Sequence, residues 1–237
     1  MTMTDPQRVA VVTGANRGLG RAIATELAER GLRVIITARD AQAADALSRE
    51  LNEKGLVTSG HQLDVTDPVS VALCFADVGI QQGRLDVLVN NAGIAIDRGQ
   101  LAAGPDLERV HATMETNLMG AWRCAAAAIV EMRSNGYGRI VNITSHLGSI
   151  STMADTNVAY RVSKAGLNAL TRILAVELRG TNILVNAVSP GRISTRMAAG
   201  ETDRTPEQAT DTPVWLATLP DDGPTGGLFH NREPLSW

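Results

Sequence analysis

The chain alternates short, continuous apolar runs with longer segments of helical periodicity, and this alternation constrains the fold more than any other feature. The runs show no polar alternation, which is typical of strands covered by helices on both faces of a parallel sheet. Helix signals stand between them, because Asp40 and Asp67 occupy N-cap positions and Gly31 and Gly55 occupy positions where helices stop. The pattern predicts strands over 9–12, 34–36, 57–63, 86–89, 139–144 and 182–188, and helices over about 23–31, 41–54, 68–80, 106–132, 158–179 and 206–219.

This strict order of strand and helix predicts an α/β fold, a single-domain Rossmann-type doubly wound parallel sheet of six or seven strands. The 237 residues suffice for one large domain or two small ones, and no linker, repeat or low-complexity block divides the chain before about Gly191. We therefore expect one domain over 1–237, with a variable substrate loop and C-terminal segment from about residue 192. Ligands of such a sheet bind beyond the carboxyl ends of its strands, so functional residues are expected in the loops that follow the strands.

Charge and composition argue against several classes of partner. Lys and Arg number 22 against 25 Asp and Glu, so no excess positive field is present to hold nucleic acid or an anionic membrane. The longest apolar stretches fall short of the roughly 18 residues that span a bilayer, and no targeting signal is visible. Cys74 and Cys124 are too few for a disulfide framework, and no Cys or His cluster has metal-ligand spacing. We expect a cytoplasmic protein without a metal site.

A glycine-rich turn follows the first predicted strand, with the sequence Thr13-Gly14-Ala15-Asn16-Arg17-Gly18-Leu19-Gly20. Glycines there let the backbone turn sharply and approach a pyrophosphate that lies on the N-terminus of the next helix. The spacing G-x-x-x-G-x-G differs both from G-x-G-x-x-G and from the G-K-[ST] of a P-loop. A structural role in strand-to-helix packing is the alternative, and the position after the first strand favours a phosphate cradle.

Further polar elements follow the later strands. The segment Asn90-Asn91-Ala92-Gly93 follows the fourth strand, Asn117 lies in the next helix, and Ser145 follows the fifth strand. Tyr160 and Lys164 are four residues apart on the helix after that, and therefore share one face. In isolation such a pair is usually an exposed tyrosine and a solvated lysine, but its place among the other post-strand elements favours a site. An apolar stripe lies about opposite the pair and consists of Val162, Ala165, Ala169, Ile173 and Val176.

Together these elements resemble the short-chain dehydrogenase/reductase family, because its TGxxxGxG, NNAG, Asn, Ser, YxxxK and PG motifs occur here in order. The resemblance covers about residues 8–197, and the PG motif is Pro190-Gly191. The C-terminal segment from Thr212 to the terminal Trp237 resembles the carbonyl reductase branch of the family. Membership implies the same α/β fold and a nicotinamide cofactor. Members of the family associate through the helices that hold Asn117 and Tyr160, and the sequence leaves the oligomeric state of this chain open.

The resemblance implies catalytic roles for Asn117, Ser145, Tyr160 and Lys164. Tyr160 would be the acid/base, because the ammonium of Lys164 and a cationic nicotinamide would bring its pKa from about 10 toward neutrality. Lys164 would also hold the nicotinamide ribose, and Ser145 would hydrogen-bond the substrate oxygen and stabilise the charge that develops on it. Asn117 would hold a water that links Lys164 to solvent, whereas a helix-interior amide bonded to backbone is the alternative.

Ser145 stands fifteen residues before Tyr160, slightly more than is usual in the family, and Thr144 and Ser149 are neighbouring hydroxyls. Ser145 is the best match for the family serine. The added residues fall in 147–156, a loop that the resemblance places at the border of the substrate. The expected pocket walls are 94–100, 146–156 and 192–202, which mix Ile, Leu and Met with Arg98, Arg192 and Arg196 and suit a moderately apolar carbonyl compound.

Two signals for the cofactor disagree. Asp40 lies 20 residues beyond Gly20, where an NAD site of this fold carries a carboxylate for the ribose. By resemblance, Arg39 and Arg17 occupy the family's basic positions for a 2′-phosphate, and Asp40 is free to cap the next helix. We therefore predict NADP(H). By resemblance, the carboxylate of Asp64 and the backbone N–H of Val65 read the adenine, and a turn-forming role for Asp64 is the alternative. The predicted cofactor-binding residues are Gly14, Asn16, Arg17, Gly18, Leu19, Gly20, Arg39, Asp64, Val65, Asn91, Ala92, Gly93, Tyr160, Lys164, Pro190, Gly191, Ile193 and Thr195.

The sequence thus predicts an oxidoreductase that reduces ketones or aldehydes to alcohols with NADPH, with Tyr160 as proton donor. An NAD-dependent secondary alcohol dehydrogenase is one alternative, and a non-catalytic nucleotide-binding module is another. The phenol and the ammonium of Lys164 together speak against the binding module, which would need neither. The expected partners are a small carbonyl or alcohol substrate and, in a homo-oligomer, further copies of this chain.

Overall fold

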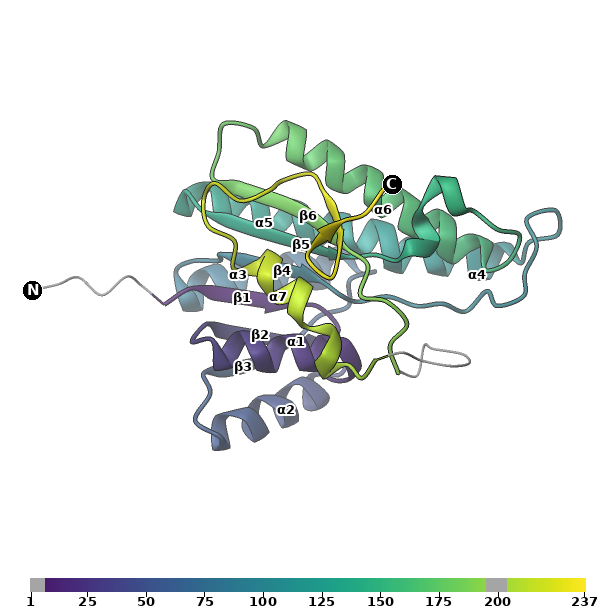
Figure 1. The fold of residues 1–237 in the computed structure, drawn as a ribbon. Coiled ribbons are helices and arrows are strands. Elements are labelled where there is room, and N and C mark those ends of the chain that lie inside the picture. The colour runs from purple at the N-terminus through teal and green to yellow at the C-terminus, as the bar shows by residue number, and fades with distance from the viewer. Residues whose placement is uncertain (1–6, 195–203) are drawn as a thin grey trace, which may run out of the picture.

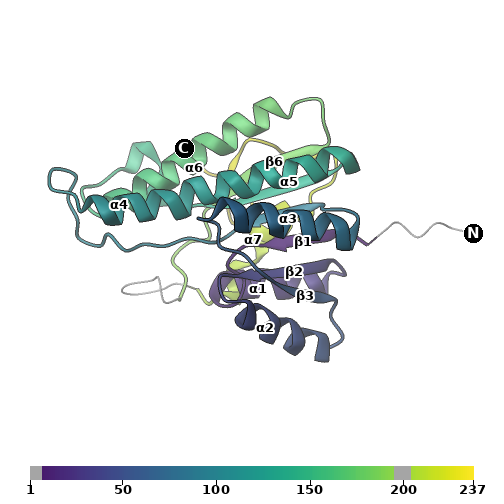
Figure 2. The ribbon, with the colours of Figure 1, turned by 180° about the vertical axis from the view of Figure 1, so that it is seen from behind.

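One sheet lies between two layers of helices, which gives the α/β fold expected from the sequence (Figures 1 and 2). The computed structural model describes residues 7–194 and 204–237. The strand order is β3-β2-β1-β4-β5-β6-β7-β8, and every neighbouring pair is parallel except β7 and β8. The strands are β1 (Val9–Val12), β2 (Arg33–Ala38), β3 (Thr58–Gln62), β4 (Val87–Asn90), β5 (Gly138–Ile143), β6 (Ile183–Val188), β7 (Leu228–His230) and β8 (Glu233–Pro234).

Two separate hydrophobic cores explain why the strands are continuously apolar. Ala10 and Val12 of β1 pack into the core on one face of the sheet, whereas Val9 and Val11 pack into the core on the other. Successive side chains of a strand point to opposite faces, so a sheet covered on both sides needs an apolar residue at every position. One face is covered by α1 (Gly18–Glu29), α2 (Ala41–Glu53) and α7 (Asp211–Ala217), and the other by α3 (Pro68–Gln82), α5 (Ala121–Asn135) and α6 (Val158–Glu177).

The predicted helix signals are confirmed at both ends of α2 and at the start of α3. The carboxylate of Asp40 accepts the backbone N–H of Gln42 at 2.9 Å, and that of Asp67 accepts the N–H of Val69 at 2.9 Å. Gly55 follows α2 with φ +82°, the left-handed conformation that ends helices. Local capping chemistry therefore sets these boundaries, as expected from the sequence.

The helix predicted over 106–132 is one continuous helical rod, but its middle is not an α-helix. It consists of α4 (Leu107–Met114), the π-helical turn η1 (Glu115–Gly120) and α5. Gly120 ends the π turn where Val65 lies so close that a Cβ on the glycine would be 2.7 Å from Cγ2 of that valine. π turns of this kind are frequent at functional sites, and this one contains Asn117.

The C-terminal segment, for which no strand was predicted, extends the sheet. β7 pairs with β6, and β8 turns back antiparallel on β7, so the sheet has eight strands and is not parallel throughout. These strands have three and two residues, which is too short to give a recognisable periodicity. Asn231 and Arg232, both at positive φ, make the tight turn between them in place of the glycine that usually marks such a turn.

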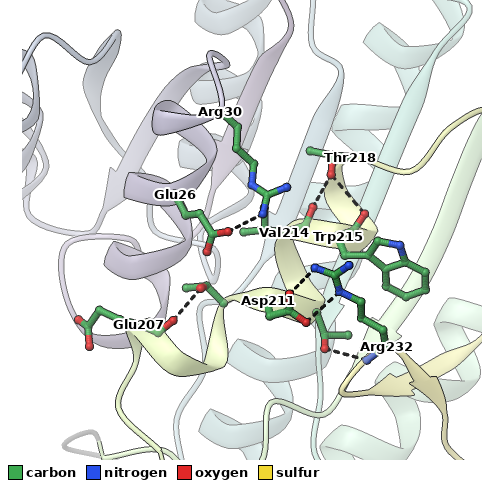
Figure 3. Close-up of polar contacts among 10 residues, drawn as sticks. Glu26, Arg30, Glu207, Asp211, Val214, Trp215, Thr218 and Arg232 are labelled. Carbon is green, nitrogen blue, oxygen red and sulfur yellow. Dashed lines mark hydrogen bonds and ion pairs between the residues drawn. The ribbon is translucent and has the colours of Figure 1, made fainter.

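Polar and aromatic contacts tie this segment to α7 (Figure 3). Nε of Arg232 donates to Asp211 at 2.9 Å, and its backbone N–H donates to the hydroxyl of Thr212 at 3.0 Å. Trp215 and Phe229 meet edge to face with ring centroids 5.3 Å apart. The helix predicted over 206–219 is shorter than expected and consists of the 3-10 turn η4 (Glu207–Ala209) followed by α7.

In the described part of the chain no helix is both long and apolar enough to cross a bilayer.

Candidate active site

A cleft of about 1640 Å³ lies at the carboxyl ends of the strands, where the topology predicts a ligand site. The segments after β1, β2, β3, β4, β5 and β6 all contribute to its lining. Asn117 lies directly behind this lining, and Thr195 falls outside the described residues. The remaining predicted site residues all line the cleft, namely Gly14, Asn16, Arg17, Gly18, Leu19, Gly20, Arg39, Asp64, Val65, Asn91, Ala92, Gly93, Ser145, Tyr160, Lys164, Pro190, Gly191 and Ile193.

The glycine turn has the geometry of an anion cradle. Gly14 and Gly18 have φ of +62° and +56°, which L side chains rarely adopt, and a Cβ at Gly20 would lie 2.6 Å from the carbonyl oxygen of Gly14. Arg17 occupies the N-cap position of α1 and makes no side-chain capping hydrogen bond. The first amides of α1 are therefore left for another acceptor, which fits the pyrophosphate of a dinucleotide.

The loop after β4 is bonded directly to this turn. Nδ2 of Asn91 donates to the carbonyl oxygens of Thr13 at 2.8 Å and Gly14 at 3.1 Å. In return, the hydroxyl of Thr13 accepts the backbone N–H groups of Asn91 and Ala92, each at 2.9 Å. Sequence reasoning missed Thr13, because its role depends on a partner 78 residues away.

Asn117 is bonded to the same loop. Its Oδ1 accepts the N–H of Ile94 at 2.8 Å, and its Nδ2 donates to the carbonyl oxygen of Ile94 at 2.9 Å and to the hydroxyl of Ser163 at 3.0 Å. That hydroxyl donates in turn to the carbonyl oxygen of Tyr160 at 2.7 Å. The amide of Asn117 thus links the loop after β4 to the helix that carries Tyr160.

Tyr160 and Lys164 face the cleft from α6, and Ser145, which follows β5, lines the same cleft. Nζ of Lys164 lies 5.7 Å from the centroid of the Tyr160 ring and donates to the carbonyl oxygen of Ile143 at 2.8 Å. Burial lowers the pKa of Lys164 to about 8. Burial also raises the pKa of Tyr160, a hydrogen bond with the side chain of Ser145 lowers it, and the charge of Asp97 raises it further. The side chains alone therefore shift this pKa opposite to the expected direction, because burial outweighs the hydrogen bond with Ser145.

Ser145 and Ser149 are clearly distinguished. The hydroxyl oxygen of Ser145 accepts the N–H of Leu147 at 3.2 Å, and the residue lines the cleft. Ser149 is buried away from the cleft, with its hydroxyl 3.0 Å from that of Ser151. The loop that follows Ser145 folds as the 3-10 turns η2 (His146–Gly148) and η3 (Ile150–Thr152). Only its first residues reach the cleft.

Arg17, Arg39 and Asp64 are further residues of the predicted cofactor site, and Asp40 is the carboxylate of the NAD alternative. Arg17 and Arg39 are exposed and line the cleft, whereas the carboxylate of Asp40 is engaged in capping α2. Oδ1 of Asp64 accepts the N–H of Thr66 at 3.0 Å and its hydroxyl at 2.7 Å, as its turn-forming alternative requires, and Asp64 also lines the cleft. Among residues 7–194 and 204–237 no group of three or more His, Cys, Asp or Glu side chains is arranged to hold a metal ion.

Comparison with known proteins identifies the family, because the model of the short chain dehydrogenases matches residues 8–206. The chain belongs to the short-chain dehydrogenase family. This is a family of oxidoreductases that use a nicotinamide cofactor. The cleft of this short-chain dehydrogenase is therefore of the type that binds a nicotinamide dinucleotide.

Curated relatives include two reductases of different substrates. The chain is 39% identical to the 3-oxoacyl-[acyl-carrier-protein] reductase FabG of Escherichia coli over 196 residues, which cover 83% of this chain and 78% of the relative. It is 32% identical to carbonyl reductase [NADPH] 3 of Mus musculus over an alignment of 281 positions, which covers 99% of this chain and all of the relative.

Solved structures with the same fold include salutaridine reductase from Papaver somniferum and gox2181. The first has a TM-score of 0.81 at 27% identity, over 95% of this chain and 100% of that one. The second has a TM-score of 0.83 at 32% identity, over 90% and 89%.

Proposed function

We propose that this short-chain dehydrogenase reduces a ketone or aldehyde to an alcohol with NADPH. The observation that carries the proposal is the arrangement of Ser145, Tyr160 and Lys164 in the same cleft that the glycine turn enters. When bound, the reduced nicotinamide supplies the hydride. Tyr160 donates its phenolic proton to the substrate oxygen, and Ser145 hydrogen-bonds that oxygen and stabilises its developing negative charge.

The other site residues support this step. Lys164 stabilises the phenolate left on Tyr160 and binds the nicotinamide ribose, and Asn117 holds a water through which the proton is replaced. Gly18, Leu19 and Gly20 offer their amides to the pyrophosphate, and Asp64 with Val65 contacts the adenine. Pro190, Gly191, Ile193 and Thr195 hold the nicotinamide, and the segment from about residue 192 shapes the substrate pocket.

A tyrosine pair in this chain allows a clean test of the proton donor. Tyr160→Phe removes the proton and leaves the ring, so we expect turnover of an activated ketone to fall by about 10²- to 10⁴-fold with little change in NADPH affinity. Loss of NADPH absorbance measures turnover, and fluorescence titration measures affinity. The control is Tyr137→Phe, because Tyr137 is the only other tyrosine and its hydroxyl bonds to Arg8 outside the cleft. Turnover of Tyr160→Phe equal to that of the control would refute the proposal.

We propose NADP(H) because two guanidinium groups, of Arg17 and Arg39, are available in the cleft for a 2′-phosphate. At roughly 1.5–3 kcal/mol for each charged hydrogen bond, Arg39→Ala should weaken NADPH binding by about 10- to 100-fold and leave NADH binding almost unchanged. Arg49→Ala is the matched control, since it removes an equal, exposed charge from α2 outside the cleft. Tighter binding of NADH than of NADPH by the unmodified protein would favour the NAD-dependent alternative, with Asp40 on the ribose.

We propose a moderately apolar carbonyl compound as substrate, a cytoplasmic location and a homo-oligomeric state. The names of the relatives support a carbonyl substrate, since one is a 3-oxoacyl reductase and another a carbonyl reductase named for NADPH. Burial raises the pKa of both thiols, Cys74 and Cys124, to about 12, which suits a reducing compartment in which neither needs to react.

A further inference from the structure

The helix that carries the proposed proton donor is capped differently from α2, α3 and α4. α2, α3 and α4 are each capped by the aspartate that immediately precedes them, Asp40, Asp67 and Asp106. Asn157 occupies the N-cap position of α6, with φ +54°, and makes no side-chain capping hydrogen bond. The first turn of α6 therefore takes its acceptor from a distant part of the chain.

That acceptor is Asp97, in the loop after β4. Its Oδ2 accepts the backbone N–H of Ala159 at 2.7 Å and that of Tyr160 at 3.2 Å, across 62 residues of sequence in the first case. Its own carbonyl oxygen accepts the N–H of Gln100 at 3.1 Å, which fixes the turn that presents the carboxylate. A carboxylate at a helix N-terminus is stabilised by the helix dipole and by charge-assisted hydrogen bonds, so this contact fixes the backbone of Tyr160 itself.

The burial of Asp97 indicates more than an ordinary cap. Its side chain is fully buried, and Oδ1 has no hydrogen-bond partner. An unpaired buried oxygen costs stability, which the exposed local cap of α3, Asp67, does not incur. Such a cost is typical of functional sites, where geometry and charge at a reacting group matter more than stability.

The position of Asp97 connects three parts of the cleft. In the same short loop, Asn91 is bonded to the glycine turn and Ile94 is bonded to Asn117. Asp97 adds the start of α6 as the third attachment. The loop thus links the cofactor-binding turn, the π-helical turn and the helix of Tyr160.

We propose that Asp97 is a positioning residue for Tyr160, and that its carboxylate holds the first turn of α6 in register with the loop after β4. The inference rests on the proposed function, because it assumes that Tyr160 donates the proton. Asp97 acts through the backbone of α6 and does not touch the substrate.

Its charge has a separate, measurable effect. The groups around the phenol are Ser145 after β5, Lys164 on α6 and Asp97 after β4, and the cleft wall adds Arg98, His146 and Arg192. The negative charge of Asp97 raises the pKa of Tyr160. Because reduction requires the protonated phenol, removing that charge moves the alkaline limit of the reaction to lower pH.

Two substitutions separate geometry from charge. In Asp97→Asn the amide oxygen still accepts both N–H groups, so we expect kcat near neutral pH to stay within about threefold while the alkaline limb of its pH profile moves to lower pH. In Asp97→Ala the cap is lost as well, and we expect kcat to fall by about 10- to 100-fold with the dissociation constant of NADPH within about threefold. The control is Asp67→Ala, which removes a cap from α3, a helix that contributes no residue to the lining of the cleft, and should lower stability without changing kcat or the pH profile.

A titration that does not depend on turnover completes the test. The chain has two tyrosines, so in a Tyr137→Phe background the ultraviolet absorbance of phenolate reports Tyr160 alone, and Asp97→Asn should lower its pKa. Wild-type kcat in a folded Asp97→Ala would overturn the positioning role, and an unmoved titration and pH profile in Asp97→Asn would overturn the effect of the charge. If Asp97→Ala fails to fold, Asp97→Ser, which keeps only one shorter acceptor, takes its place in the same kcat comparison. An active Tyr160→Phe would instead refute the proposed function, whereas an inactive Tyr160→Phe beside unaffected Asp97 variants refutes only the positioning role.

Discussion

Burial of the charged Lys164 side chain lowers the stability of the folded state by an unusual amount for a single residue. Its side chain is only 5% exposed, and its ammonium donates to the carbonyl oxygen of Ile143 at 2.8 Å. Burial moves its pKa from 10.5 to about 8, so the folded state disfavours the charged form. The difference corresponds to a cost of about 3 kcal/mol for holding the ammonium in the fold. The cofactor ribose and the phenolate of Tyr160 are the groups that would justify that cost.

The pH dependence of stability tests this cost. Below about pH 8 the lysine is charged both folded and unfolded and the full cost is present, and as the pH rises from there toward 10.5 the cost is lost. The free energy of unfolding of Lys164→Met minus that of the wild type, without cofactor, should therefore fall by up to about 3 kcal/mol over this range. Chemical denaturation at several pH values measures it. A pH-independent difference would contradict the buried-charge interpretation. The same variant should lose turnover and NADPH affinity together.

At this scale the sequence identifies residues that belong to local motifs. Ser145, Tyr160 and Lys164 stand at recognisable spacings, and all three line the cleft. Thr13 and Asp97 act through hydrogen bonds to backbone groups 62 or more residues away, and the sequence next to them does not indicate these bonds. Long-range hydrogen bonds of single residues leave no periodic signal, which is why sequence reasoning missed both.

The elements that are predicted well are those whose burial is uniform. The run over 9–12 coincides with β1, because both faces of that strand are covered and each residue must be apolar. β7 and β8 were missed, because they are short strands at the sheet edge held by side-chain contacts such as that of Trp215 with Phe229. The π turn at Glu115–Gly120 was also missed, since one wide turn inside a continuous helix has no residue signature of its own.

α6 illustrates how an apolar stripe can be misleading. The face that carries Lys164 is buried, whereas the apolar stripe opposite it is exposed, with Val162, Ile173 and Val176 accessible over 53%, 60% and 44% of their surface. The periodicity of the helix was predicted correctly, but it does not reveal which of two faces meets the core. An apolar face that remains exposed in a folded chain is typical of a surface covered by another molecule.

At the scale of the whole molecule, α5 and α6 together carry an exposed apolar surface. We define it as the α5/α6 face, which consists of Trp122, Ala126 and Val130 on α5 and Val162, Ala169, Ile173 and Val176 on α6. The helices lie side by side on the same side of the sheet in Figures 1 and 2, with a groove of about 390 Å³ between them. Arg133 and Glu177 flank this groove and form an exposed ion pair with each other at 3.8 Å, so the groove is apolar with a charge-balanced rim. We therefore propose this face as the contact of the proposed homo-oligomer, with a second copy of the chain as its occupant.

A matched pair of substitutions tests that assignment. Ile173 on α6 and Leu73 on α3 are both 60% exposed, so a glutamate at either position perturbs the isolated chain equally little. At the α5/α6 face, however, association would bury the new carboxylate against Trp122 and Val130 of the partner without a counter-charge, which costs several kcal/mol in practice. Ile173→Glu should therefore weaken self-association by at least about 100-fold, and Leu73→Glu should leave it unchanged. Light scattering after size exclusion over a range of concentrations measures both, and NADPH titration verifies that each variant is folded. A wild-type chain that stays monomeric at high concentration, or equal weakening by both variants, would show that this face is not the contact between copies.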